Sequence, residues 1–228
     1  PLRAFPTEDG RWRLRANLEN TDPLFIEALI GVEDERFYSH WGVDVLAVVR
    51  ASGQALTNGR IVSGASTITM QTARLLEPRP RNLGSKLIEM FRAFQLERRL
   101  SKDEILELYL TLTPYGGNLE GLRSASWAYF GREPDRLSDD QIALLLALPQ
   151  SPEVRRPDLR LENARAARAR LLERRLRLER LGQRLVAGEV EVEQPAALVA
   201  RVGGPEPGPP RHVRPRLAVP PARQRVEE

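Results

Sequence analysis

The chain of 228 residues contains no cysteine. This absence excludes disulfide bonds, zinc sites built from thiolates and a cysteine nucleophile. Long apolar runs are also missing, because none reaches the ~18 residues that a membrane-spanning helix needs, and no signal peptide opens the sequence. Since the first residue is Pro1 rather than Met, we expect a fragment of a longer protein whose N-terminal anchor or leader is not included.

Lysine is scarce as well. Only Lys86 and Lys102 are lysines among the 35 basic residues, and arginine supplies the rest. The formal net charge is +4, and such a charge suits nucleic acid, an anionic membrane surface or a phosphorylated substrate. A solvated arginine-rich face explains the same charge equally well.

Aromatic residues are absent from the last part of the chain, since all of them lie between Phe5 and Phe130. Because aromatic side chains contribute much of the buried area of a core, we expect the core in the first part. Residues 195–228 instead hold eight prolines, which is typical of a linker or a disordered tail. We therefore predict three parts: an N-terminal β-hairpin or linker at 1–20, a folded domain at 21–188, and a Pro/Arg-rich linker or disordered tail at 189–228.

The predicted secondary structure is almost entirely helical. Residues 2–5 and 12–14 flank the turn signal Asp9-Gly10 and predict a short β-hairpin. Capping boxes begin at Ser101 and Ser138, each with an acidic or amide residue three positions later. Together with apolar residues at helical spacing, these signals predict helices at about 23–32, 43–58 and 165–185, and helices that begin near 83, 102 and 139. The predicted fold class is mainly α with a small β element.

Three acidic residues, Glu33-Asp34-Glu35, follow the apolar run 28–32 and precede Phe37 and His40. A carboxylate beside apolar groups is partly desolvated, and this environment favours general acid–base catalysis. The alternative is a solvated helix end. Taken by itself, His40 fits a hydrogen-bonded structural residue.

Two later segments combine hydroxyl groups, a cation and a carboxylate. Ser66 and Thr67 follow a glycine at a predicted helix start within 64–71, where free amide donors and hydroxyls can bind an anion such as phosphate. An ordinary Ser/Thr helix cap explains this pattern too. Lys86 and Glu89 are three residues apart and share a helix face, for which a surface ion pair is the simpler interpretation.

Five ordered motifs resemble those of the peptidoglycan glycosyltransferases, glycosyltransferase family 51, which form the N-terminal catalytic unit of class A penicillin-binding proteins. The first two read Glu33-Asp34-x-x-Phe37-x-x-His40-x-Gly42 and Gly64-x-Ser66-Thr67-Ile68-x-x-Gln71. The other three are Lys86-x-x-Glu89, then residues 105–110 with Gly116-Gly117 and Gly121, and finally residues 168–172. The resemblance covers about residues 24–180. Residues 64–71 and 115–121 are similar to the penicillin-binding protein 1C type.

The resemblance implies a lysozyme-like, mostly α fold and the polymerisation of lipid II, a disaccharide-pentapeptide joined through pyrophosphate to an isoprenoid. In this inverting β-1,4 transfer the acceptor hydroxyl attacks the anomeric carbon of the growing strand, and undecaprenyl pyrophosphate leaves. Glu33 matches the family's general base. Glu89 matches its second glutamate, which acts beside the pyrophosphate either with a divalent cation such as Mg²⁺ or by orienting Lys86.

The same resemblance implies the substrate-binding positions. Lys86 matches a residue that neutralises the leaving pyrophosphate, and Asp34 belongs to this set as a support for Glu33. The remaining matching positions are Phe37, His40, Gly64, Ser66, Thr67, Gln71 and Arg168. Metal ligands remain unassigned.

The implied partners are lipid II, the nascent glycan strand and a membrane surface, together with further cell-wall synthesis proteins, and nucleic acid is not expected. The implied location is the extracytoplasmic (periplasmic) face of a bacterial cell membrane. Such domains carry an apolar lobe that faces the membrane, here around 75–125. We nevertheless expect core packing for at least half of its apolar residues: Leu75, Leu76, Leu83, Leu87, Ile88, Phe91 and Phe94. No Ser-x-x-Lys transpeptidase signature occurs, so we expect no penicillin binding.

Two positions depart from the family pattern. Ser85 stands where an arginine usually precedes the lysine, and Thr111 stands where an asparagine is usual. These departures leave open a catalytically silent domain that binds lipid II. The residues also fit a lysozyme-like hydrolase, or a nucleic-acid binder built on the basic helix from Arg165, although that helix lacks interleaved aromatic residues for base stacking.

Overall fold

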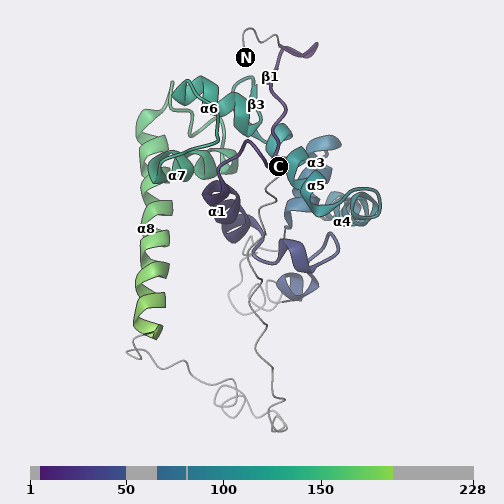
Figure 1. Ribbon diagram of the computed structural model, residues 1–228. Helices are drawn as coiled ribbons and strands as arrows, with labels where there is room; N and C mark the ends of the chain where they lie inside the picture. The colour runs from purple at the N-terminus through teal and green to yellow at the C-terminus, as the bar shows by residue number, and fades with distance from the viewer. Residues whose placement is uncertain (1–5, 50–65, 81, 187–228) are drawn as a thin grey trace, which may run out of the picture. The chain divides into compact units, whose positions relative to one another are not determined.

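The computed structural model describes residues 6–49, 66–80 and 82–186 and is mainly helical (Figure 1). This confirms the predicted fold class. The chain divides into two compact units, Pro1–Leu178 and Glu179–Glu228, and the features below belong to the first, apart from the part of α8 after Leu178. The predicted boundary between residues 188 and 189 lies outside the described residues. The described helices are α1 (Pro23–Glu33), α3 (Ile68–Leu76), α4 (Leu83–Glu97), α5 (Lys102–Leu112), α6 (Leu122–Phe130), α7 (Asp139–Ala147) and α8 (Leu161–Val186), with the 3₁₀ helices η1 (Phe37–Ser39) and η2 (Leu148–Gln150).

Most helices begin where their capping signals stand. Asp22 caps α1 by accepting the Leu24 N–H, with Pro23 in the first turn. Asn82 caps α4 through the Ser85 N–H. Both capping boxes close, at the starts of α5 and α7. A side chain that satisfies otherwise unpaired amide donors at such a start typically contributes ~1 kcal/mol, which is why these four starts were predictable.

Other boundaries differ from the predictions. The predicted helix at 165–185 starts earlier, because α8 begins at Leu161. Residues 45–49 are helical as expected, but the predicted end of that helix near 58 lies outside the described residues. Helix α6 was not predicted at all. It follows Gly121, which has a positive φ of 86° and no side chain to act as a cap.

A small sheet joins the beginning of the described chain to its middle. Its strands β1 (Trp12–Arg13), β2 (Pro114–Gly116) and β3 (Leu119–Glu120) lie in the order β1-β3-β2. The turn predicted at Asp9-Gly10 is present, since the Gly10 N–H donates to the Thr7 carbonyl. The strand after this turn pairs in parallel with β3, and the predicted partner segment 2–5 lies outside the described residues.

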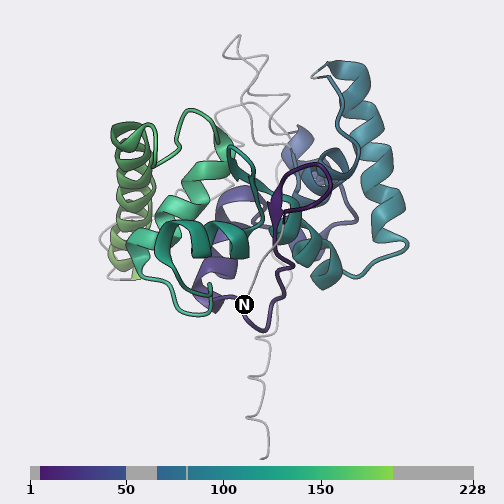
Figure 2. The same ribbon diagram turned by 90° about the horizontal axis from the view of Figure 1, so that it is seen from above.

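The main hydrophobic core lies among α1, α5, α6 and α7. Its fully buried members include Phe25, Phe37, Ile105, Leu106, Leu122, Leu145 and Leu148. Each such side chain contributes about 1.5–3 kcal/mol through the surface that it removes from water. Figures 1 and 2 show α3, α4 and α5 together on one side of this unit and α7 with the first turns of α8 on the other.

A second, smaller cluster holds α4. It consists of Val43, Met70 and Ala93. Gly42 presses against this helix, because a Cβ built at Gly42 would lie 2.9 Å from the backbone carbonyl atoms of Ala93. Gly42 also has a positive φ of 76°, so both the close approach and the backbone conformation require glycine there.

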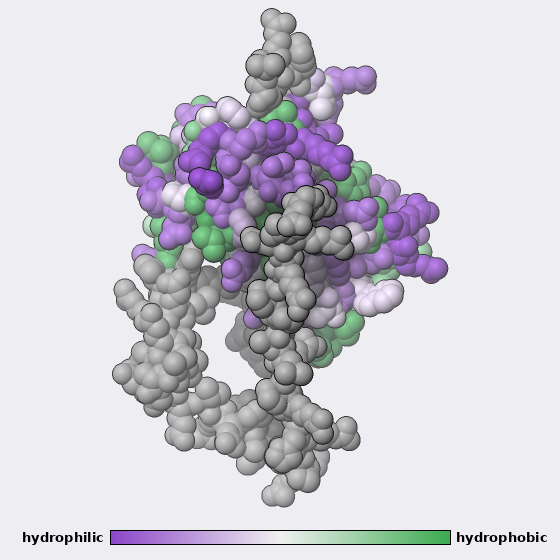
Figure 3. Space-filling model, viewed as in Figure 1, coloured by the Kyte–Doolittle hydropathy of each residue, from purple (hydrophilic) through white to green (hydrophobic). Residues whose placement is uncertain are grey.

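Most of the seven apolar residues named above in the lobe around 75–125 face solvent, and the expectation of core packing for at least half of these seven is wrong. Of the seven, Leu75 packs against the main core. The others are exposed: Leu76, Leu83, Leu87, Ile88, Phe91 and Phe94. Most of the face visible in Figure 3 is hydrophilic, with hydrophobic residues in separate patches. None of the described helices is both long and apolar enough to cross a bilayer.

Candidate active site

Glu33 is the last residue of α1, and its carboxylate faces α3. The Gln71 side-chain amide donates to Glu33 Oε2 at 3.0 Å. Gln71 lies one turn into α3, so its side chain projects from the first part of that helix. Within the described part of the chain this amide is the hydrogen-bond partner of Glu33, and the second carboxylate oxygen is left available for another proton donor.

Two buried tyrosines stand near Glu33. Burial raises the pKa of Tyr109 above its usual range, and the negative charge of Glu33 raises it further. Burial also raises the pKa of Tyr115, with added contributions from Tyr109 and Glu33. Both phenols therefore stay protonated at neutral pH. The surroundings of Glu33 among the described residues thus include the neutral Gln71 amide and two neutral phenols, and Arg74 also acts on Tyr109.

Asp34, the next residue, is buried and ties the end of α1 to the start of α3. Each of its oxygens lies 3.0 Å from His40 Nε2. Asp34 Oδ2 also accepts the Ile68 N–H at 3.0 Å, at the first turn of α3. These bonds fix the spacing between the helix that carries Glu33 and the helix that carries Gln71.

Phe37 and His40 pack next to Asp34, between the end of α1 and the start of α3. Phe37 has no exposed surface, so its contacts are with the protein core. Its ring meets the His40 ring edge to face at 6.4 Å between centroids. The His40 side chain is 9% exposed, and its Nδ1 is buried with no hydrogen-bond partner among the described residues. Its hydrogen bond to Asp34 agrees with the interpretation of His40 as a hydrogen-bonded structural residue.

Thr67 is an ordinary helix cap. Its hydroxyl oxygen accepts the Met70 N–H at 3.1 Å, and its hydroxyl donates to the Gly42 carbonyl at 2.5 Å. The Ile68 and Met70 amides at the start of α3 are thus already bonded within the protein. For these two donors the alternative of an ordinary Ser/Thr cap applies, because side chains of the same chain accept their hydrogen bonds.

Ser66 belongs instead to a cluster around Lys86. Lys86 Nζ donates to Ser66 Oγ at 2.7 Å and to Glu89 Oε2 at 3.2 Å. The Lys86 side chain is 36% exposed and the Glu89 side chain 9%. The buried carboxylate therefore holds the ammonium at a place that solvent, and hence an anionic ligand, can reach.

Arg74 is a member of this cluster that the sequence reasoning missed. Its Nη1 lies 4.0 Å from Glu89 Oε1. Arg74 stands three residues after Gln71 and seven after Thr67, so the helical period places all three on one face of α3. That spacing was the available signal. Ser85, which replaces the family's usual arginine, is buried in the first turn of α4, and Arg74 supplies a second cation from the neighbouring helix.

These side chains are arranged as a row along one face of α3. Gln71 and Arg74, neighbours on α3, connect the Glu33 carboxylate at one end with the Lys86 and Glu89 pair of α4 at the other. The transglycosylase family model matches residues 2–176. The chain belongs to the transglycosylase family. This confirms the resemblance inferred from the five motifs.

Individual relatives agree with this assignment. Penicillin-binding protein 1C of Escherichia coli is 50% identical over 174 residues, which are 76% of this chain and 23% of the relative. Penicillin-binding protein 1A of the same organism is 40% identical over 166 residues, 72% of this chain and 19% of the relative. A putative transglycosylase of Cupriavidus necator is 39% identical over 157 residues, which are 68% of each chain. The chain thus spans less than a quarter of the two penicillin-binding proteins.

One described position of the transglycosylase motifs, Arg168, stands apart from the row. Arg168 lies on α8, where its Nε is 3.5 Å from Asp140 Oδ1 of α7. The structure does not bring Arg168 together with the other predicted site residues. Gly64 lies outside the described residues. The departure at Thr111 has a structural use, because its hydroxyl oxygen accepts the Ala16 N–H at 3.1 Å.

The described residues do not build a metal site of their own. They contain no group of three or more histidine, aspartate or glutamate side chains that could hold an ion. The Glu89 carboxylate already lies between Lys86 and Arg74. A role for Mg²⁺ stays a proposal that would require ligands from the substrate.

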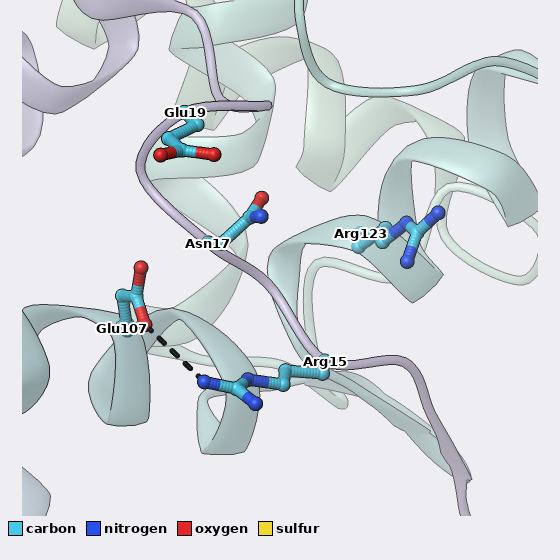
Figure 4. Close-up of a pocket in the computed structure, with 5 residues that line it drawn as sticks. All are labelled: Arg15, Asn17, Glu19, Glu107 and Arg123. Atoms are coloured by element: carbon cyan, nitrogen blue, oxygen red, sulfur yellow. Dashed lines mark ion pairs between the residues drawn. The ribbon is translucent and has the colours of Figure 1, made fainter.

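A separate cavity of about 410 Å³ is lined by residues from the segment after β1 and from α5 and α6 (Figure 4). Its lining residues are Arg15, Asn17, Glu19, Glu107 and Arg123. Arg15 pairs with Glu107 across it at 3.8 Å. Glu107 is two positions from Tyr109 on α5, so their side chains leave the helix in roughly opposite directions. This cavity is therefore not part of the row at Glu33.

Proposed function

We propose that this chain is a peptidoglycan glycosyltransferase that polymerises lipid II into glycan strands. One observation carries the proposal. Residues on one face of α3 lie between the Glu33 carboxylate, which has one oxygen available, and two cations, Lys86 and Arg74. Glycosyl transfer from a lipid pyrophosphate requires a base at the attacking hydroxyl and positive charge at the leaving group.

Glu33 acts as the general base in this proposal. Its Oε2 is engaged by the Gln71 amide at 3.0 Å, which sets the orientation of the carboxylate without neutralising it. The other oxygen of Glu33 accepts the proton of the acceptor hydroxyl while the hydroxyl oxygen attacks the anomeric carbon. The new glycosidic bond forms while the bond to the pyrophosphate breaks, and the configuration inverts.

Lys86 stabilises the negative charge that develops on the departing pyrophosphate. A lysine suits this task because its ammonium is a compact charge with three donors. Two of these donors are directed at Ser66 and Glu89, which leaves a third for a phosphate oxygen. Arg74 adds a second cation on the other side of Glu89, so Glu89 orients both charges. The second cation favours an active enzyme over the silent lipid II-binding domain that Ser85 and Thr111 left open.

The exposed stripe on α4 is proposed to lie against the membrane that holds the lipid substrate. Leu83, Leu87 and Phe91 recur at every fourth residue and are 82%, 67% and 61% exposed. Amphipathic helices with such a stripe bury it at the boundary between headgroups and acyl chains. The site would then face the extracytoplasmic surface of a bacterial membrane, where lipid II and the nascent glycan strand meet.

Glu33→Gln tests the function most directly, because it removes the base and keeps the shape. We expect the turnover of purified lipid II to fall by ~10²–10⁴-fold, the usual contribution of a general base. Glu35→Gln is the matched control, since Glu35 is an exposed acid two residues away, and it should retain normal turnover. If Glu33→Gln keeps more than about a tenth of the activity, the assignment of the base is wrong. Binding of lipid II without any polymer from the unmodified chain would identify a silent domain.

A further inference from the structure

Lys102 lies at a helix N-terminus, a position where a positive charge is ordinarily unfavourable. It is the first residue of α5, directly after the Ser101 cap. The N-terminus of a helix carries partial positive charge, so a lysine there is unfavourable and acidic residues are preferred. The chain uses arginine for nearly all of its cations, and yet a lysine stands here. Its contacts with other elements must therefore explain its presence.

Those contacts are a buried ion pair and an aromatic ring. Lys102 Nζ lies 2.6 Å from Glu97 Oε1, with the two side chains 18% and 8% exposed. Glu97 is the last residue of α4. The same ammonium stands 4.5 Å from the centroid of the Phe37 ring, within the range of a cation–π interaction. A compact ammonium fits between a carboxylate and a ring face, whereas the planar guanidinium of arginine is larger.

From Phe37 the contacts lead to the end of α1. The Phe37 N–H donates to the Asp34 carbonyl at 2.9 Å. Its ring packs against His40, whose Nε2 is bonded to the Asp34 carboxylate. Asp34 is the neighbour of Glu33. A change in the tilt of the Phe37 ring is therefore transmitted to the turn that follows the proposed base.

From Glu97 the contacts lead to the start of α3. The Thr69 hydroxyl donates a hydrogen bond to Glu97 Oε1 at 2.7 Å, and Thr69 has no exposed surface. Two residues later Gln71 donates to Glu33. Glu33 and Gln71 lie on two different chain segments, the end of α1 and the start of α3. The ammonium of Lys102 contacts both segments indirectly, the first through Phe37 and the second through Glu97 and Thr69.

We propose that Lys102 is a positioning residue that fixes the Glu33–Gln71 hydrogen bond. It does not touch the substrate, and it acts by holding the end of α1 and the first turn of α3 at one spacing. The kinetic part of this proposal rests on the proposed glycosyltransferase function. The geometric part can be tested without it.

Lys102→Met is the decisive variant, because methionine keeps an apolar stem and removes the charge. We expect kcat for lipid II polymerisation to fall at least about tenfold, with KM within about twofold, because the Lys86 cluster is untouched. Lys102→Arg should recover part of the loss. Tyr38→Phe is the matched control: it removes the 3.0 Å hydrogen bond from Tyr38 to Asp103 between the same two elements, η1 and α5, and should leave kcat unchanged.

Nuclear magnetic resonance provides a readout that is independent of turnover. The chain has two histidines, His40 and His212, so ¹⁵N-labelled histidine gives a small set of ring signals. In Lys102→Met the ring signals of His40 and the side-chain amide signals of Gln71 should move. Glu97→Gln keeps the shape of the other partner and should move the same signals, which covers the case that Lys102→Met does not fold.

The outcomes separate the two proposals. If the unmodified chain makes no polymer but Lys102→Met moves the His40 and Gln71 signals, the proposed function fails and the positioning role stands. If the unmodified chain polymerises lipid II and Lys102→Met leaves kcat or those signals unchanged, the positioning role is overturned. A lower melting temperature with unchanged kcat and signals would identify Lys102 as a purely structural ion-pair partner.

Discussion

Around α6 and α7 the first unit is held by apolar packing, and Leu122 and Leu145 have no exposed surface. Around α3 and α4 many of the contacts are polar. There the apolar cluster is small, and hydrogen bonds and ion pairs connect α3 to its neighbours through Asp34, Gln71 and Glu89. The comparison shows that the largest apolar core and most residues of the proposed site lie in different parts of one unit. The charged groups of the proposed site range from the buried Asp34 and Glu89 to the partly exposed Lys86.

The largest effect on stability should come from the apolar side. Leu145→Ala leaves a cavity in the main core, and such truncations cost ~2–5 kcal/mol. Chemical denaturation should show this loss in the free energy of unfolding. Leu159→Ala is the control, because Leu159 is 68% exposed, and it should change the free energy by less than ~0.5 kcal/mol. Equal losses from both variants would mean that the core does not dominate stability.

A smaller effect, on rate rather than stability, should come from Lys86→Arg. The charge is kept, but a planar fork replaces a compact ammonium between Ser66 and Glu89. We expect turnover of lipid II to fall about tenfold, equivalent to ~1.4 kcal/mol in the barrier, with the melting temperature unchanged. Normal turnover would mean that Lys86 is only a structural partner of Glu89. It would also weaken the contrast between the apolar region around α6 and α7 and the polar region around α3 and α4.

The smallest effect on stability should come from the exposed stripe of α4. Leu87→Ser combined with Phe91→Ser removes two side chains that contribute little to the fold, so the free energy of unfolding should change by no more than ~0.5 kcal/mol per site. Co-sedimentation with anionic lipid vesicles should nevertheless fall severalfold. Val154→Ser, at an exposed apolar residue outside α4, is the control. Undiminished sedimentation of the double variant would contradict the membrane-facing proposal.

The sequence predicted what depends on local signals. Asp22, Asn82 and the two capping boxes each act within one helical turn, and the helices begin where these residues stand. The motif residues Glu33, Gln71, Lys86 and Glu89 were also identified, because a family pattern carries them. The role of each remains a proposal, although the structure brings all four into one row.

What depends on distant contacts was not predictable from these signals. The pairing of Trp12 with Leu119 joins residues that no local pattern connects. The position of Arg74 beside Glu89 requires knowledge of how α3 packs on α4. The exposure of Leu83 and Phe91 could not be told from burial by periodicity, because an apolar stripe that meets a core and one that faces outward have the same spacing.

The parallel pairing of β1 with β3 also has a consequence for synthesis on the ribosome. Arg11 and Arg13 form ion pairs with Glu120, so the first described strand lacks its partners until more than a hundred further residues have been translated. At ~5–20 residues per second this delay lasts roughly 5–20 s. During that time Trp12 lacks its strand partner, and both flanking arginines lack Glu120. The N-terminal segment is thus expected to dock after α1 and α3–α5 have emerged, as a late step in folding.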